Sequence, residues 1–255
     1  MRQAGKLGRL APHPKSTHPR VSLEDHFDLS KIVVPPVVDR ASKVSSWPMY
    51  LNDQLGDCTA AGVGHAEQAL SAYGGTEVDL TDNTILKLYE ATGGYVPGDP
   101  STDNGAVMQD VLDYWQKNGV AGHKIDAYAE LEDFYHTANL RKALYLFGTV
   151  YLGINFPASA MDQFNNGQPW RYEAGSPIEG GHCIVLQKMN QTGTPDILDI
   201  VTWGELHPMN IQFSQHYVEE AWVVIDKEWI TASGTDVDGF SLDALIQDFH
   251  DMTGQ

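Results

Sequence analysis

The chain has 255 residues, of which 42% are hydrophobic and 20% charged, and these values predict a globular protein of one large domain or two lobes. Its formal net charge of −18 weighs against nucleic acid and anionic membranes as partners, because an acidic body repels phosphates. No run is long and apolar enough to predict insertion into a membrane. Two cysteines cannot form a disulfide framework, and without CxxC, HExxH or Asp-rich calcium motifs the sequence predicts neither metal nor cofactor.

Residues 1–45 are punctuated by proline and glycine and are expected to form an extended N-terminal arm. Residues 1–20 contain five basic residues and no acidic one, whereas the remainder carries 11 basic and 34 acidic residues. Such an arm could bind an acidic partner in a protein assembly, or the acidic body of its own chain, or it could be a frayed terminus. It has no apolar core of the kind that a secretory signal requires.

The segment 46–130 is expected to form a helical lobe, and its first helix follows Gly56 and the N-cap residue Asp57. Cys58 would then lie in the first helical turn, where free backbone N–H groups and the helix dipole favour a reactive thiolate. The alternative is that Cys58 is a small buried hydrophobic residue. Two further helices are expected over 81–93 and 106–117.

The segment 131–235 is expected to form a β lobe, with a short helix at 137–147 and a polar loop at 157–180. The strands are predicted at 149–156, 183–189, 197–203 and 221–226. Residues 236–255 should add a C-terminal helix, centred on 241–252. Helices first and strands second indicate an α+β protein.

His182 is the best candidate for a base that could activate Cys58. It follows Gly180 and Gly181 and opens the apolar run from Cys183 to Leu186, which is typical of a buried strand. A nucleophilic cysteine needs such a base, usually from a distant part of the sequence. The alternative is a satisfied core histidine. His65 is excluded as the base because it lies roughly 10 Å along the same helix as Cys58.

Several motifs in this order resemble the papain-like cysteine peptidases. The motifs are QLGDCTA at 54–60, LTDN at 80–83, the Asp103-Asn104-Gly105 turn, LRKALYLFGTVYLGINF at 140–156, GGHCIVL at 180–186 and TWGE at 202–205. The resemblance implies a two-lobe fold, with a helical lobe facing a lobe of antiparallel sheet or barrel. The fragment LNDQLGDCTAA is also similar to phage and actinobacterial members of this group, which suggests a phage particle or virion as one setting.

The resemblance implies acyl transfer, with Cys58 as nucleophile and His182 as general base acting on a peptide or another amide. An oxyanion would be stabilised by the Cys58 backbone N–H and by a side-chain amide. Asn52 has the family's spacing for that amide and Gln54 has its residue type, so both remain candidates. The substrate cleft is expected to include Trp203, Gly181, Asn104 and Gly105.

The sequence departs from the family at the residue that orients the imidazole. The family has Asn at this position, which here is Val201, and valine cannot accept a hydrogen bond. Thr202 and Asp199 are the nearby candidates for that role. A weak or inactive papain-fold protein with a binding or structural role, for instance in a phage particle, is therefore the alternative to a peptidase. Acyl transfer to an amine remains a third possibility, and the lack of the family's disulfides suits a reducing compartment.

Overall fold

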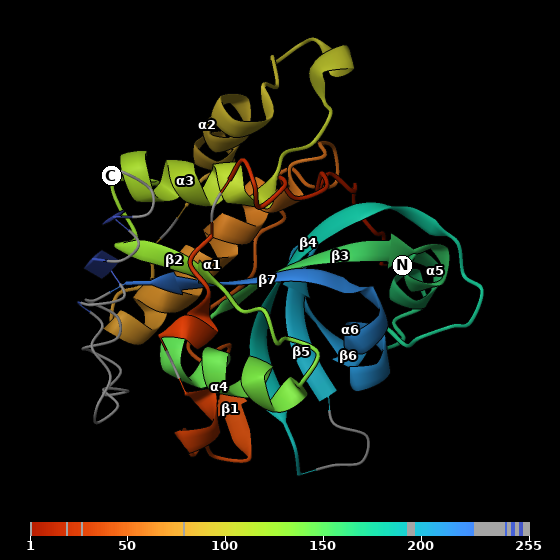
Figure 1. Ribbon diagram of the computed structural model, residues 1–255. Coiled ribbons are helices and arrows are strands. Elements are labelled where there is room, and N and C mark those ends of the chain that lie inside the picture. The colour runs from red at the N-terminus through yellow and green to blue at the C-terminus, as the bar shows by residue number, and fades with distance from the viewer. Residues whose placement is uncertain are drawn as a thin grey trace.

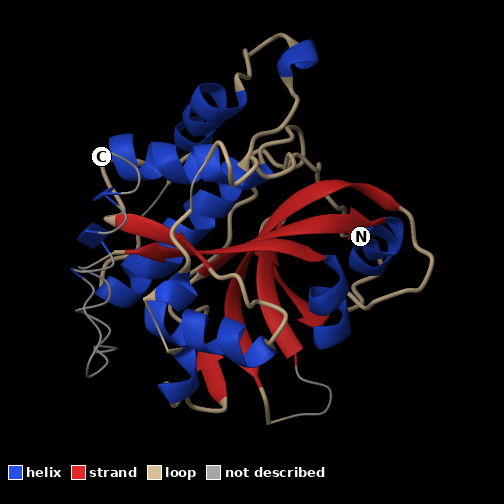
Figure 2. Cartoon of the chain, in the orientation of Figure 1, coloured by secondary structure: helices blue, strands red, loops and turns tan. Residues whose placement is uncertain are grey.

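A computed structural model describes residues 2–18, 20–26, 28–78, 80–192 and 197–226, together with Asp243, Ile246, Gln247, His250 and Asp251. In this part of the chain, α1 to α3 lie on one side of the molecule and most of an antiparallel sheet lies on the other (Figure 1). Figure 2 shows the strands as one curved sheet with helices around it. The predicted α+β class is confirmed.

The helical side consists of α1 (Cys58–Gly74), α2 (Asp82–Gly93) and α3 (Met108–Asn118). Helix α1 is buried along almost its whole length, because α2 and α3 pack on it from one side and the sheet from the other. Glycines make this possible. A Cβ on Gly62 would lie 2.6 Å from the Tyr151 ring, and one on Gly64 would lie 2.8 Å from Ile85. The small residues of α1 therefore set how closely Cys58 approaches the sheet.

The sheet has the strand order β2-β7-β3-β4-β5-β6, and β1 pairs with β4 outside this path. All these pairs are antiparallel. The strands are β1 (Val37–Asp39), β2 (Ala127–Glu130), β3 (Val150–Pro157), β4 (Ile178–Asn190), β5 (Ile197–Thr202), β6 (Glu205–Asn210) and β7 (Val218–Ile225). The remaining helices are α4 (Thr137–Phe147), α5 (Ala158–Asn165), α6 (Ile211–Tyr217) and the 3-10 turns η1 (Leu23–Asp25), η2 (Leu29–Lys31) and η3 (Pro100–Thr102).

The predicted helices at 81–93, 106–117 and 137–147 are confirmed to within two residues. The loop predicted at 157–180 is partly wrong, because α5 occupies its beginning with Ala160 and Phe164 buried one turn apart. Strand β6 was not predicted, since it contains Pro208, which is typical of an edge strand, and β6 ends the strand order. The helix predicted over 241–252 falls mostly outside the described residues.

The N-terminal arm lies on the body of the protein, and the five basic residues of its first 20 positions all pair with acidic side chains of the same chain. The pairs are Arg2–Glu205, Lys6–Asp103, Arg9–Glu219, Arg9–Glu220, Lys15–Glu130, Lys15–Glu132 and Arg20–Glu130. In Figure 1 the red arm passes α3 toward the marked N-terminus. The basic side chains of residues 1–20 therefore bind the acidic body of their own chain, which was one of the partners that the sequence suggested. Among the described helices, none is long and apolar enough for a membrane span.

Candidate functional site

Cys58 is the first residue of α1 and is only 2% exposed. The turn before it is held by Asp103, whose Oδ1 accepts a hydrogen bond of 2.9 Å from the Gly56 backbone N–H. The same Asp103 oxygen accepts a bond of 2.7 Å from the Tyr89 hydroxyl. The loop that contains Asp103 therefore fixes the start of α1 and the position of the thiol.

His182 lies on β4, opposite Ile154 of β3, and is almost fully buried. Its Nε2 and the Thr202 Oγ1 form a hydrogen bond of 2.8 Å, whereas its Nδ1 is buried without a hydrogen-bond partner among the described residues. The ring also stacks on Trp203, with a centroid distance of 4.7 Å. His182 thus has one nitrogen fixed by a hydroxyl and the other available for proton transfer.

The Trp203 ring is placed by the tight turn between β5 and β6. Trp203 and Gly204 both have positive φ, 45° and 73°, as the two central residues of a type I′ hairpin turn do. This conformation is rare for a bulky side chain and costs free energy, so packing must hold it. Trp203 packs on His182 and also on Phe156 and Phe164, which hold the indole over the imidazole.

Helix α1 meets β4 beside His182. The backbone of Cys183, the next residue after His182, hydrogen-bonds to the Cys58 thiol, and this contact lowers the pKa of that thiol. Helix α1 also needs Gly62 here, because a Cβ at that position would lie 2.9 Å from the Cys183 sulfur. Cys58 and Cys183 are both free thiols, as two cysteines outside any disulfide framework led us to expect.

The structure separates the two candidates for an oxyanion donor. Asn52 is buried and follows two non-glycine residues with positive φ, Tyr50 at 53° and Leu51 at 68°. Its Nδ2 donates to the carbonyl oxygens of Leu55 at 3.0 Å and Lys6 at 3.2 Å. Gln54, in contrast, is exposed. The strained turn before Asn52 thus places its side-chain amide against the arm, whereas the Gln54 side chain faces solvent.

Residues 4–10 of the arm make backbone contacts with the body beside Cys58. The backbone N–H groups of Gly8 and Arg9 donate to the Gly181 carbonyl at 3.1 and 3.0 Å. The Gly8 carbonyl accepts from Ala106 at 2.9 Å. Gly8 also hydrogen-bonds through its backbone to the Cys58 thiol. The arm therefore lies between the start of α1, β4 and the loop before α3.

The fit of the arm is tight enough to require glycine. A Cβ on Gly8 would lie 1.8 Å from the Gly56 carbonyl oxygen, and a Cβ on Gly181 would lie 2.1 Å from the Arg9 carbonyl oxygen. A Cβ on Gly105 would lie 2.1 Å from the Gly8 carbonyl oxygen. Any side chain at these three positions would separate the arm from the body.

The other predicted residues are distributed as follows. Trp203 contacts the arm through Nε1, which donates to the Lys6 carbonyl at 3.2 Å. Asn104 is exposed, and its side chain bonds to the Ser101 carbonyl. Asp199 pairs along the sheet with Lys188, and the charge of Lys188 acts on its carboxylate. Asn104 and Asp199 therefore have other partners, and the hydrogen bond to His182 comes from Thr202.

Burial keeps both the Cys58 thiol and the His182 imidazole neutral. It raises the pKa of Cys58 to about 12, against the opposing effects of the Cys183 and Gly8 backbones. It also lowers the pKa of His182 to about 3, and the positive charge of Arg9 acts in the same direction. The thiolate expected from the helix dipole is therefore not the favoured form in this closed state, because desolvation outweighs the dipole.

Asp57, which the sequence suggested only as a cap, is fully buried beside Cys58. Burial raises the pKa of its carboxyl to about 8, with Asn52 opposing and the charges of Asp103 and Asp53 adding to the rise. Since a charged Asp57 in turn raises the pKa of Cys58, this carboxyl is linked to the thiol. The expected cap bond from its side chain is absent in the described helix start.

We predict that Asp57→Asn flattens the loss of stability at rising pH. The folded carboxyl binds its proton more tightly than an unfolded one, so Asp57 favours folding below its ordinary pKa and opposes it as pH rises toward about 8. An asparagine side chain does not titrate, so the substitution should raise the free energy of unfolding at pH 8 relative to pH 5 by about 4 kcal/mol. Urea unfolding at both pH values measures this difference.

Asp99→Asn is the control for this measurement, because the Ser101 hydroxyl lowers the pKa of the exposed Asp99 carboxyl. A lowered pKa stabilises the fold above the ordinary pKa, so this variant cannot imitate the effect of Asp57→Asn. If the free energy of unfolding depended on pH equally in wild type and Asp57→Asn, the raised pKa of Asp57 would be contradicted.

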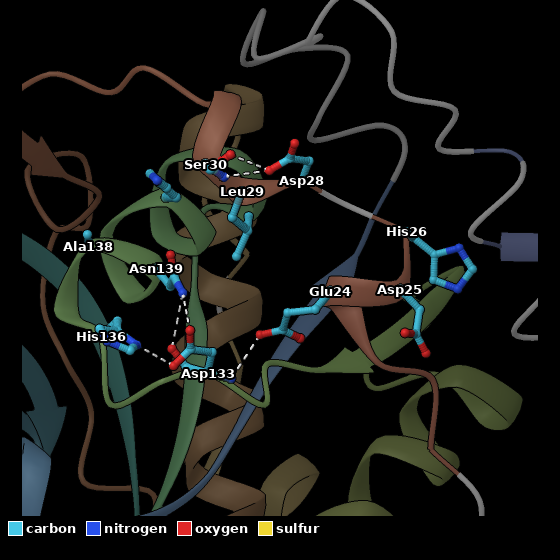
Figure 3. A pocket seen from close by; sticks show the side chains of 11 residues that line it. Glu24, Asp25, His26, Asp28, Leu29, Ser30, Asp133, His136, Ala138 and Asn139 are labelled. Carbon is cyan, nitrogen blue, oxygen red and sulfur yellow. Dashed lines mark hydrogen bonds and ion pairs between the residues drawn. The ribbon is translucent and has the colours of Figure 1, made fainter.

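Two other features of the described residues lie apart from Cys58. A surface hollow of about 780 Å³ lies between η1, η2 and α4 (Figure 3). It is lined by Glu24, Asp25, His26, Asp28, Leu29, Ser30, Asp133, His136, Ala138, Asn139 and Lys142. His13, His18 and Asp110 form a half-buried group whose possible ligand atoms lie within 4.8 Å of one another. In that group His13 Nε2 and Asp110 Oδ1 are hydrogen-bonded at 2.9 Å, which joins the arm to α3.

Comparison with protein-family models and with curated protein sequences found no match. Comparison with solved structures found several proteins of similar fold but low sequence identity. Xylellain, a cysteine protease from Xylella fastidiosa, has a TM-score of 0.67 at 15% identity, over 88% of this chain and 97% of xylellain. Digestive procathepsin L2 proteinase from the Tenebrio molitor larval midgut gives 0.62 at 13% identity, over 86% and 78%. ProCathepsin B S9 from Trypanosoma congolense gives 0.60 at 11% identity, over 86% of both chains. The chain therefore has a papain-like fold.

Proposed function

We propose that the chain is a cysteine peptidase or related amidase, in which Cys58 attacks the carbonyl carbon of an amide and His182 accepts the thiol proton. The observation that carries the proposal is the state of His182: Nε2 is held by the Thr202 hydroxyl, and Nδ1 is buried and unpartnered among the described residues, one residue from the backbone that contacts the thiol. A base with one fixed nitrogen and one free nitrogen is what acyl transfer requires.

Asn52 completes this site as the oxyanion donor, together with the Cys58 backbone N–H. Its side-chain amide already donates to a peptide carbonyl of the arm, that of Lys6. The same amide would donate a hydrogen bond to the negatively charged oxygen that develops on a substrate carbonyl during attack. Substrates are then peptides or other amides extended along Gly181 and Ala106, whose backbone groups now bind the arm.

The arm makes this proposed enzyme latent. The Gly8 backbone hydrogen-bonds to the Cys58 thiol, and the Gly8 carbonyl accepts a hydrogen bond from the Ala106 N–H. Nucleophilic attack needs the carbonyl carbon of a substrate near the sulfur, and the arm takes the place beside the sulfur that such a carbon would need. Displacement of residues 4–10 would admit substrate and water and restore an ordinary pKa to the thiol.

A papain-fold protein without turnover is the second candidate, and the buried, neutral thiol and imidazole favour it. In that case the arm is a permanent part of the core. A role in a phage particle would need another surface than the arm's basic side chains, since these pair with acids of the chain itself.

The deciding experiment compares full-length wild type, Gly8→Ala and Gly8→Ala/Cys58→Ala. We expect Gly8→Ala to cleave fluorogenic peptides and to bind an epoxysuccinyl peptide covalently at Cys58, located by mass spectrometry, because the added methyl group cannot fit against Gly56. The double variant should do neither. Equal cleavage by both variants would remove Cys58 from the mechanism, and no adduct or cleavage with Gly8→Ala would favour the second candidate.

A further inference from the structure

Arg9 of the arm extends its side chain into a buried pocket beside the candidate dyad. Its guanidinium is almost completely enclosed, and its side chain is only 2% exposed. The pocket has room for it because position 153 is glycine: a Cβ there would lie 2.7 Å from Arg9 Cδ. The groups that face the guanidinium are the side chains of Asn155 on β3 and of Glu219 and Glu220 on β7.

The pocket presents acceptors in the arrangement that a guanidinium needs. Arg9 Nη1 donates to Glu220 Oε1 at 2.8 Å, and Nη2 donates to Glu219 Oε2 at 2.5 Å and to Asn155 Oδ1 at 3.1 Å. The other oxygen of Glu220 accepts from Trp222 Nε1 at 2.9 Å, so this carboxylate is held from both sides. A planar donor of fixed geometry fits these acceptors better than the point charge of lysine.

An empty pocket would leave Glu220 in an unfavourable state. The Glu220 side chain is 1% exposed, and desolvation raises the pKa of its carboxyl, while Arg9 is the largest opposing influence. Removing the partner of a buried charge is strongly destabilising. The Glu219 side chain is 37% exposed and contributes less, because water screens it. A cation that enters the pocket is therefore favoured over a neutral side chain.

The pocket also lies close enough to Cys58 to bind a side chain of a substrate peptide. Arg9 directly follows Gly8, whose backbone hydrogen-bonds to the Cys58 thiol. The Arg9 backbone N–H bonds to the Gly181 carbonyl, next to His182. A peptide that replaced the arm along Gly181 would thus place one side chain in this pocket close to the reacting sulfur.

We propose that this pocket makes the chain selective for peptides with an arginine close to the cleaved bond, and that Arg9 occupies it in place of the substrate arginine. The selectivity rests on the peptidase function proposed above. Glu220 supplies the charge, Asn155 and Glu219 supply further acceptors, and Gly153 supplies the space.

The test uses the full-length Gly8→Ala/Arg9→Ala chain, so that the arm no longer competes for the pocket. Two matched sets of fluorogenic peptides are compared, each with one reporter bond. In one set arginine is placed in turn at each position before this bond, and in the other set its neutral isostere citrulline takes the same positions. At one position we expect kcat/KM to be about 100-fold higher with arginine, as a charge-assisted, fully buried contact implies. Adding Glu220→Gln should reduce the ratio below about 10. Glu219→Gln should reduce it less, and Glu132→Gln, which affects only a pair with Lys15, should preserve it.

A second readout needs no turnover. The synthetic peptide AGKLGRL, the sequence of residues 4–10, should protect Cys58 of the same variant from iodoacetamide, and its citrulline version should protect at least about 10-fold less well. If peptides protect in this way but none is cleaved, the pocket stands and the peptidase function fails. If arginine and citrulline peptides behave alike in both assays, the arginine selectivity is wrong.

Discussion

Full-length Gly8→Ala should react with iodoacetamide at Cys58 about a thousand times faster than the wild-type chain near neutral pH. The thiolate is the reactive form, and burial raises the pKa of Cys58 to about 12. Returning this pKa to its ordinary 9.0 would increase the thiolate fraction at pH 7 about a thousandfold. Since the reagent also gains access, this factor is a conservative expectation.

The substitution is chosen because the contact at Gly8 cannot adjust. A Cβ would lie 1.8 Å from the Gly56 carbonyl oxygen, 2.4 Å from its carbonyl carbon and 2.7 Å from its Cα, all backbone atoms at the start of α1. The backbone of Gly56 is itself held by Asp103. We therefore expect the arm to move rather than Gly56, and this movement also separates the buried Arg9–Glu220 pair.

Gly74→Ala is the matched control, because a Cβ at this last residue of α1 would meet nothing within 4 Å. It should leave the alkylation rate unchanged. Peptide mapping must show the label on Cys58 in preference to Cys183, which is equally buried and whose pKa is raised well above its usual value. A Gly8→Ala rate within a few-fold of wild type would show that the arm does not control the thiol.

The sequence carried enough information for the fold. Gly56-Asp57 before a helical pattern placed the start of α1 correctly, and the apolar run after His182 placed β4 in the sheet. Both signals are local. A cap and a run of apolar residues depend on neighbours in the chain, and tertiary contacts did not override them here.

The protonation state of the Cys58 thiol could not be predicted from the same residues. A helix N-terminus predicts a lowered pKa for Cys58, but the pKa depends on whether water reaches the sulfur. The Cys58 thiol contacts the backbone of Gly8, which lies far earlier in the chain, and no local pattern connects the two positions. The signal that could have been used is the pair Gly5 and Gly8 around the basic residues, since glycine permits a backbone to lie against another backbone.

Val201 illustrates a different limit of sequence reasoning. Spacing from Trp203 placed the missing orienting residue at position 201, and Val201 is indeed buried in β5 opposite Val185 and Leu206. Successive side chains of a strand point to opposite faces, so residues 201 and 202 do not share one. The structure brings Thr202 to the imidazole, and an asparagine side chain would not reach it from the Val201 face. Restoring the family's residue should therefore only destabilise the chain.

Thr202→Val should lower kcat of the arm-displaced Gly8→Ala protein about 100-fold while Thr202→Ser retains most of it. Valine has nearly the shape of threonine but cannot hydrogen-bond, so the 2.8 Å contact with His182 Nε2 would be lost. Both ring nitrogens of His182 would then lack a partner in a buried site, and its tautomer and orientation would no longer be fixed. Loss of an orienting partner costs orders of magnitude in rate, and a neutral hydroxyl should contribute less than a carboxylate.

The pH profile distinguishes this role from simple packing. If Thr202 acts through the imidazole, Thr202→Val should change the pH dependence of kcat/KM, because the hydroxyl influences which nitrogen carries the proton and how readily. Val201→Ala provides the comparison: it removes methyl groups from the opposite face of the same strand and should reduce stability without moving that profile. A Thr202→Val protein with the rate and profile of its Gly8→Ala parent would show that packing against Trp203 alone positions His182.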